Sequence, residues 1–103
     1  MAVSVTIYRG GVDVRFYLDS EGTPHIHGHG VREHEVVEAL ANLVEDGGGR
    51  DEARVAIGRT DAGRFLRVVY VPDPEPDSVF VVTAHELGPK ALWALRRRLR
   101  RRS

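Results

Sequence analysis

Apolar and polar residues alternate along the first part of the chain. Residues 3–8 show this period of two, and residues 12–18 repeat it after Arg9-Gly10-Gly11. Such alternation is typical of a half-buried strand, and a short glycine-containing break between two such runs predicts a β-hairpin. The turn-forming residues 19–24 end the second run.

The spacing of apolar residues changes between Arg32 and about Asp46. It becomes that of an amphipathic helix, with apolar positions at Val36, Val37, Leu40, Leu43 and Val44. Glutamates crowd the first turns, where the helix dipole favours negative charge. We therefore expect a helix over residues 32–46, followed by a flexible loop at Gly47-Gly48-Gly49.

Three further runs have the composition of strands, at residues 55–57, 65–71 and 79–84. The turn residues 60–63 predict that the first two form a hairpin. The last two are apolar on both faces, which predicts central strands covered at least in part on both sides. Between them, residues 72–77 form an acidic proline-containing loop that we expect to stay outside the sheet.

A final helix is expected over about residues 89–102. Pro89 suits its first turn, and Leu92, Leu95 and Leu99 form its inner stripe. The predicted order is β-β-α-β-β-β-α, an α+β fold with a mostly antiparallel sheet of about five strands and two helices. At 103 residues the chain is expected to form a single domain over residues 1–103.

Composition excludes several classes of site. The chain contains no cysteine, which excludes a disulfide scaffold, a zinc–thiolate site and a thiol nucleophile. The first residues lack the basic start and apolar run of a signal peptide. No segment approaches the roughly 20 apolar residues of a membrane span. We therefore expect a soluble, cytoplasmic protein that does not interact with membranes.

The net charge of zero hides a strong polarity along the sequence. Residues 89–103 contain seven basic side chains and no acidic one, whereas residues 1–88 contain eight basic and fifteen acidic ones. The two parts therefore carry +7 and −7. Six arginines in one helix without a compensating acid favour an anionic partner, either the phosphates of a nucleic acid or an acidic protein surface.

Four short segments occur in an order that resembles the BrnT-type toxins of the RelE-like toxin–antitoxin superfamily. They are His29-Gly30-Val31 before an acidic helix, Arg54-Val55-Ala56-Ile57-Gly58-Arg59-Thr60, Gly63-Arg64-Phe65-Leu66-Arg67-Val68-Val69-Tyr70, and Val81-Val82-Thr83-Ala84. The resemblance covers about residues 25–98. It implies a small α+β ribonuclease that cleaves RNA without a metal, by attack of the 2′-OH, and is neutralised by an antitoxin.

Such cleavage needs a base for the 2′-OH proton, cations for the phosphorane charge and an acid for the leaving 5′-oxygen. The resemblance points to the strand arginines and to the residues after the last strand. We therefore assign the catalytic roles to Arg64, Arg67, His85 and Glu86, and RNA binding to Arg54, Arg97, Arg98 and Arg101. Arg64 and Arg67 are three residues apart and should lie on opposite sides of the sheet.

Each of these residues also has a structural interpretation. Arg64 would then be a solvated hairpin end, His85 a surface or capping residue before the last helix, and Tyr70 a core aromatic. The chain also differs from the family pattern after Thr83-Ala84, where an arginine is common. This difference favours an alternative function: a non-catalytic binding module, or a homodimer, that docks an acidic surface through the arginine helix.

Three histidines precede the first helix. On an extended segment His25, His27 and His29 would project from one face, as metal ligands require. No cysteine or suitably spaced acid completes a ligand shell around them. We therefore assign neither a metal nor a cofactor, and interpret the segment as the connector that enters the helix.

Overall fold

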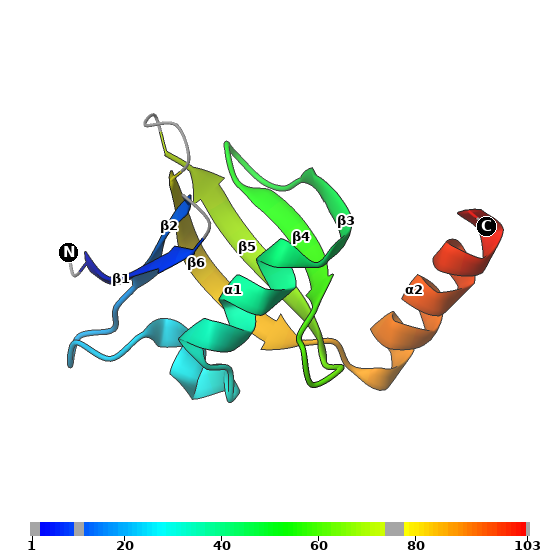
Figure 1. The fold of residues 1–103 in the computed structure, drawn as a ribbon, viewed down its shortest axis with the longest axis horizontal. Coiled ribbons are helices and arrows are strands. Elements are labelled where there is room, and N and C mark those ends of the chain that lie inside the picture. Colours follow the sequence, from blue (N-terminus) through cyan, green and yellow to red (C-terminus); the bar gives the residue numbers. More distant parts are fainter. Residues whose placement is uncertain (1–2, 10–11, 74–77, 103) are drawn as a thin grey trace.

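The computed structural model describes residues 3–9, 12–73 and 78–102. Within these ranges the chain forms strands, one short 3-10 helix (η1) and two α-helices (Figure 1). In chain order they are β1 (Val3–Arg9), β2 (Val12–Tyr17), η1 (His25–His29), α1 (Glu33–Ala41), β3 (Leu43–Gly48), β4 (Arg54–Arg59), β5 (Phe65–Pro72), β6 (Ser78–Glu86) and α2 (Pro89–Arg102). Neither described helix is long and apolar enough to cross a membrane.

The strands form one six-stranded sheet in the order β1-β2-β6-β5-β4-β3. Neighbouring strands are antiparallel except for β2 and β6, which run parallel. The N-terminal hairpin and the β3–β6 meander are thus joined into a mixed sheet where β6 lies beside β2. The α+β class, the two helices and the predicted hairpins are confirmed.

The predicted order lacks one strand. The helix expected over residues 32–46 ends at Ala41, and Leu43–Gly48 form β3 at the edge of the sheet. Pairing with β4 satisfies the backbone groups on one side of this segment, and the apolar Val44 packs against the cluster that includes residues of α2. Gly47 and Gly48, expected in a loop, therefore belong to a strand.

The loop expected between β5 and β6 is shorter than predicted at its start. Pro72 is the last residue of β5 and lies opposite Val79 of β6. A proline at a strand end is compatible with a sheet because its missing N–H removes only a terminal bond. Residues 74–77 of this loop, and Gly10-Gly11 of the predicted first turn, lie outside the described residues.

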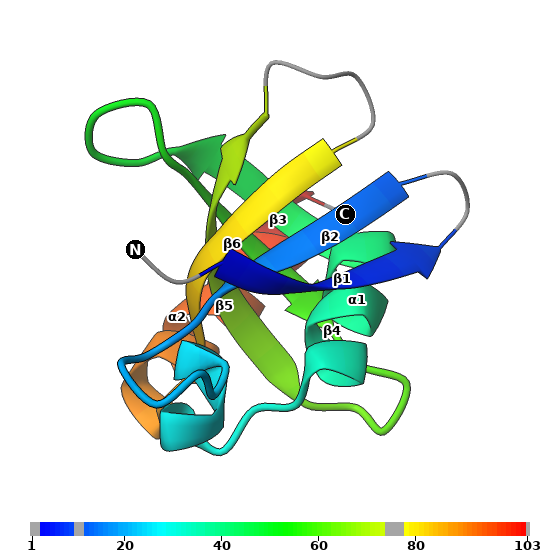
Figure 2. The ribbon, with the colours of Figure 1, turned by 90° about the vertical axis from the view of Figure 1, so that its left-hand side faces the viewer.

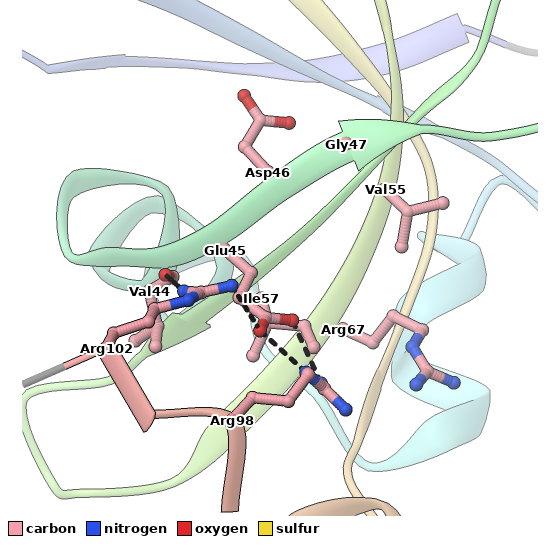
Figure 3. Close-up of a pocket in the computed structure, with 9 residues that line it drawn as sticks. All are labelled: Val44, Glu45, Asp46, Gly47, Val55, Ile57, Arg67, Arg98 and Arg102. Carbon is pink, nitrogen blue, oxygen red and sulfur yellow. Dashed lines mark hydrogen bonds and ion pairs between the residues drawn. The ribbon is translucent and has the colours of Figure 1, made fainter. Parts of the chain in front are cut away.

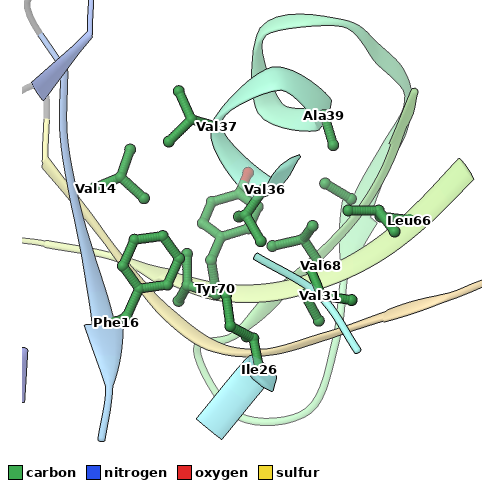
Figure 4. Packing of buried hydrophobic residues seen from close by; sticks show 13 residues of the cluster. Val14, Phe16, Ile26, Val31, Val36, Val37, Ala39, Leu66, Val68 and Tyr70 are labelled. Atoms are coloured by element: carbon green, nitrogen blue, oxygen red, sulfur yellow. The ribbon is translucent and has the colours of Figure 1, made fainter. Parts of the chain in front are cut away.

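The main core lies between the sheet and α1, and η1 closes one end of it through Ile26 (Figure 4). Its fully buried side chains are Phe16, Ile26, Leu66, Val31, Val36, Val68 and Val81. Helix α2 lies on the other side of the sheet from α1 (Figure 2). There, Leu95 of α2 packs with Ile57 and Leu87. The central strands are thus covered on one face by α1 and only in part on the other.

Gly58 of β4 sets the distance between α1 and the sheet. A Cβ atom at this position would lie 1.9 Å from the carbonyl oxygen of Ala39 in α1. We expect Gly58→Ala to lower the free energy of unfolding by about 3 kcal/mol, since overpacking against backbone cannot be relieved by a rotamer change. Chemical denaturation measures the difference.

Gly47→Ala in the adjacent strand β3 is the matched control. A Cβ atom there would have no heavy atom within 4 Å, so the stability should change by no more than about 0.5 kcal/mol. Equal stabilities of the two variants would contradict the close approach of α1 to β4.

Candidate functional site

The pairing of β5 with β6 divides the four predicted catalytic residues into two groups. Leu66 lies opposite Glu86, and Arg67 lies opposite His85. Directly paired residues of antiparallel strands share a face, and consecutive residues alternate between faces. Because Leu66 belongs to the core beneath α1, Glu86 lies on the α1 side, whereas Arg67 and His85 lie together on the opposite face.

Arg64 belongs to the α1 side and is fully engaged there. Its guanidinium donates hydrogen bonds to Glu35 (Nη1 to Oε2, 2.6 Å), Glu86 (Nη2 to Oε1, 3.2 Å) and the carbonyl oxygen of Gly30 (3.4 Å). The hydrogen bond to Glu35 raises the pKa of Arg64 against the effect of burial. Arg64 therefore ties the β4–β5 hairpin to α1, and Glu86 is one of its partners.

Arg67 has a different environment. It is half-buried and lines a cleft of about 580 Å³ between the sheet and α2 (Figure 3). The cleft residues are Val44, Glu45, Asp46, Gly47, Val55, Ile57, Arg67, Arg98 and Arg102. Within the described part of the chain, Arg67 takes part in no hydrogen bond or ion pair. Its guanidinium is therefore free of competition from acidic side chains of the described chain and is available to pair with an anion in the cleft.

The other charged groups of the cleft are already paired. Glu45 accepts two hydrogen bonds from Arg98 (2.8 and 2.9 Å) and one from Arg102 (2.9 Å). The hydrogen bond from Arg98 is the main cause that lowers the pKa of Glu45. Asp46 pairs with Arg54 (3.3 Å) and accepts a hydrogen bond from the Tyr70 hydroxyl (3.2 Å). Arg98 and Arg54, both predicted to bind RNA, thus have acidic partners within the chain.

His85 lies beside a small cluster of histidines. Its ring centroid is 6.2 Å from that of His29, which is 5.1 Å from that of His25. The Nε2 atoms of His25 and His29 are 3.4 Å apart. The Nδ1 of His85 lies 3.3 Å from the carbonyl oxygen of Glu86. Because a carbonyl only accepts, Nδ1 is the donor in this bond, which leaves Nε2 as the acceptor whenever the ring is neutral.

The histidine segment is helical rather than extended, so the condition under which all three histidines would project from one face is not met. Pro24 precedes η1, Ile26 anchors it in the core and Gly30 ends it with φ 72°. One helical turn brings His25 and His29 together, while His27 instead pairs with Glu33 of α1. Across the described residues, no group of three or more His, Cys, Asp or Glu side chains is arranged to hold a metal.

The outward face of α2 carries the remaining predicted RNA-binding residues, Arg97 and Arg101. Neither has a carboxylate partner among the described residues. The guanidinium of Arg97 lies 5.0 Å from the ring centroid of Trp93, whose residue surface is 59% exposed. Neither Trp93 nor the proximity of His29 to His85 is predicted by the sequence pattern, because both depend on the packing of segments that are distant in sequence.

Glu35 provides a test of the structural role of Arg64. Burial opposes ionisation of Glu35, but hydrogen bonds from the Arg32 backbone N–H and from Arg64 lower its pKa below the ordinary 4.5. Its stabilising contribution is therefore complete above pH 4.5 and is lost as the pH falls through the lowered folded-state pKa. We expect Glu35→Gln to be about 1–2 kcal/mol less stable at neutral pH.

The variant should also lose less stability than the native chain when the pH is lowered from about 6 to 3. Urea unfolding across this range measures both effects. Glu52→Gln, which changes an exposed carboxylate, is the control and should follow the native pH dependence. Parallel curves for Glu35→Gln and the native chain would contradict the assigned ion pair.

Comparison with known proteins adds no relative to this description. The chain matches no protein-family model, no curated protein and no solved structure. Its relation to the BrnT-type toxins accordingly stays a prediction, and the geometry of the Arg67–His85 face is what bears on function.

Proposed function

We propose that the chain is a metal-independent endoribonuclease of the BrnT/RelE-like toxin type, neutralised by an antitoxin protein. One observation carries this proposal. Arg67, which is half-buried and has no anionic partner in the described chain, is paired with His85 of the neighbouring strand and lies on the same face of the sheet. This places a fixed cation beside an imidazole, a side chain that can accept or donate a proton. Phosphate-ester cleavage requires both functions.

The reaction follows from these two residues and a neighbour. His85 Nε2 takes the proton of the 2′-OH, whose oxygen attacks the adjacent phosphorus. Arg67 pairs with the phosphorane oxygens, for which its planar fork is suited. His29 in its protonated form gives a proton to the leaving 5′-oxygen. The P–O5′ bond breaks, and the products are a 2′,3′-cyclic phosphate and a 5′-OH.

Two of the four residues first assigned to catalysis receive other roles in this proposal. Arg64 is held by Glu35 and Glu86 on the α1 side, and Glu86 lies on the face opposite to His85. Arg64 and Glu86 instead stabilise this end of β5 and β6 from the α1 side of the sheet. His29, which lies next to His85, replaces Glu86 as the second proton-transfer group.

The alternative is a non-catalytic module that docks an acidic protein, or a second copy of the chain, through α2. The exposed Trp93 and the outward arginines favour it, since tryptophan and arginine are enriched at the centres of protein interfaces. It leaves the unpartnered Arg67 without a role. We therefore place it second.

Induced expression in bacteria, followed by growth curves and electrophoresis of total RNA, tests the activity. We expect growth arrest and RNA fragments ending in a 2′,3′-cyclic phosphate, with purified protein active in EDTA. Arg67→Ala and His85→Ala should each reduce cleavage at least about 100-fold, the scale of losing one charge-stabilising or proton-transfer group.

Arg50→Ala and His34→Ala are the matched controls, because both remove exposed side chains of the same types away from the cleft. They should cleave like the native chain. Intact RNA with folded native protein, or cleavage that persists in the Arg67→Ala, His85→Ala double variant, would falsify the proposal.

The pH dependence of the cleavage rate separates the roles of the two histidines. A base must be deprotonated and an acid protonated, so the native rate should show a bell-shaped profile. His85→Ala should remove the limb on which the rate rises with pH, and His29→Ala the limb on which it falls. Loss of the same limb in both variants would contradict the division of roles.

A further inference from the structure

The outward face of α2 carries an exposed aromatic side chain among cations. Trp93, Arg97 and Arg101 are spaced by four residues and therefore form one stripe along the helix. Trp93 is 59% exposed. The stripe borders a shallow pocket of about 190 Å³, lined by Trp93, Ala94, Arg97, Arg98 and Arg101.

Packing of the helix does not explain this stripe. The inner side of α2 is anchored by Leu95, with Leu92 and Leu99 beside it, and by the ion pairs of Glu45 with Arg98 and Arg102. Trp93 is not part of the apolar cluster on that inner side, and the guanidinium of Arg97 lies over its ring, 5.0 Å from the centroid. Arg97 and Arg101 have no carboxylate partner within the described residues. The stripe thus has an uncompensated positive charge and an open aromatic surface.

The stripe is also continuous with the cleft that contains Arg67. Arg98 lines both the cleft and the shallow pocket beside Trp93. Successive members of the stripe are about 6 Å apart along the helix axis, from the 1.5 Å rise per residue. A single extended strand bound along the stripe would therefore lie beside Arg98, which also lines the cleft that contains Arg67.

We propose that this stripe binds single-stranded RNA, with a base stacked on Trp93 and backbone phosphates on Arg97 and Arg101. The inference rests on the proposed ribonuclease function and specifies its substrate as unpaired RNA. Stacking on an exposed aromatic ring combined with arginine contacts to phosphates is the usual chemistry of single-strand binding. In a duplex the faces of the bases are covered, so a paired substrate cannot use the ring.

Fluorescence offers a direct test because Trp93 is the sole tryptophan of the chain. The full chain is titrated with a single-stranded 2′-O-methyl oligonucleotide of 12 nucleotides, which lacks the attacking hydroxyl and cannot be cleaved. We expect saturable quenching of the Trp93 emission and binding that weakens with salt. The same oligonucleotide annealed to its complement should bind more weakly and quench less.

Substitutions separate stacking from charge. Trp93→Ala should weaken binding about 10-fold, as measured by fluorescence anisotropy of a labelled oligonucleotide, whereas Trp93→Phe should keep most of the affinity. Arg97→Ala with Arg101→Ala should reduce the slope of log affinity against log salt by about 1.4. The exposed positions of these side chains should leave the fold intact, which circular dichroism verifies.

Binding and cleavage fail independently in this design. The oligonucleotide reports binding without cleavage, so an inactive native chain that binds the oligonucleotide overturns only the enzyme assignment. Three outcomes overturn the stacking inference: no binding of the single strand, equal affinity of Trp93→Ala and the native chain, or tighter binding of poly-glutamate than of the oligonucleotide. The last outcome would identify the stripe as a surface for an acidic protein.

Discussion

Burial of one face of the sheet against α1 is the constraint on which the chemistry of this molecule depends. Phe16, Leu66 and Val81 are fully buried on that face, and side chains alternate along each strand. Arg67 and His85, each adjacent in sequence to a buried residue, are therefore turned to the opposite face, while Glu86 is turned toward α1. A register shift of one residue would exchange these groups, but it would also expose the core. The packing energy of the core thus fixes the position of the proposed site.

The parallel pairing of β2 with β6 has an equally direct consequence. Parallel strands have their C-terminal ends on the same side of a sheet, so the segment that follows β2 lies near the C-terminal end of β6. That segment contains η1, and His85 is the residue before the last in β6. The contact between His29 and His85 therefore results from strand direction. An antiparallel β6 would place the two histidines at opposite ends of the sheet.

Local patterns were sufficient for most elements and insufficient for the contacts that define the site. The strands of the hairpins and the basic helix follow from periodicity and turn residues close together in sequence. Leu43 and Val44 satisfy a helical stripe and an edge strand equally well, so only the free edge of β4 decides between them. The three-residue spacing of Arg64 and Arg67 predicted that they lie on opposite faces of the sheet, as the structure shows. The partners of Arg64, and the place of His29, depend on chain segments that are distant in sequence.

Four of the six arginines of α2 divide into two pairs by what faces them. Arg98 and Arg102 share the single carboxylate of Glu45 and hold the helix against the edge of the sheet, so one of their two positive charges is balanced within the chain. Arg97 and Arg101 keep theirs toward solvent, beside an aromatic ring. The polarity of +7 against −7 along the sequence thus overstates the charge available to a ligand. A phosphate entering the cleft meets Arg67 without competition, but it must compete with Glu45 for Arg98. Arg67 is therefore the cation best placed to bind the reacting phosphate, and the α2 stripe is better suited to hold the rest of the strand.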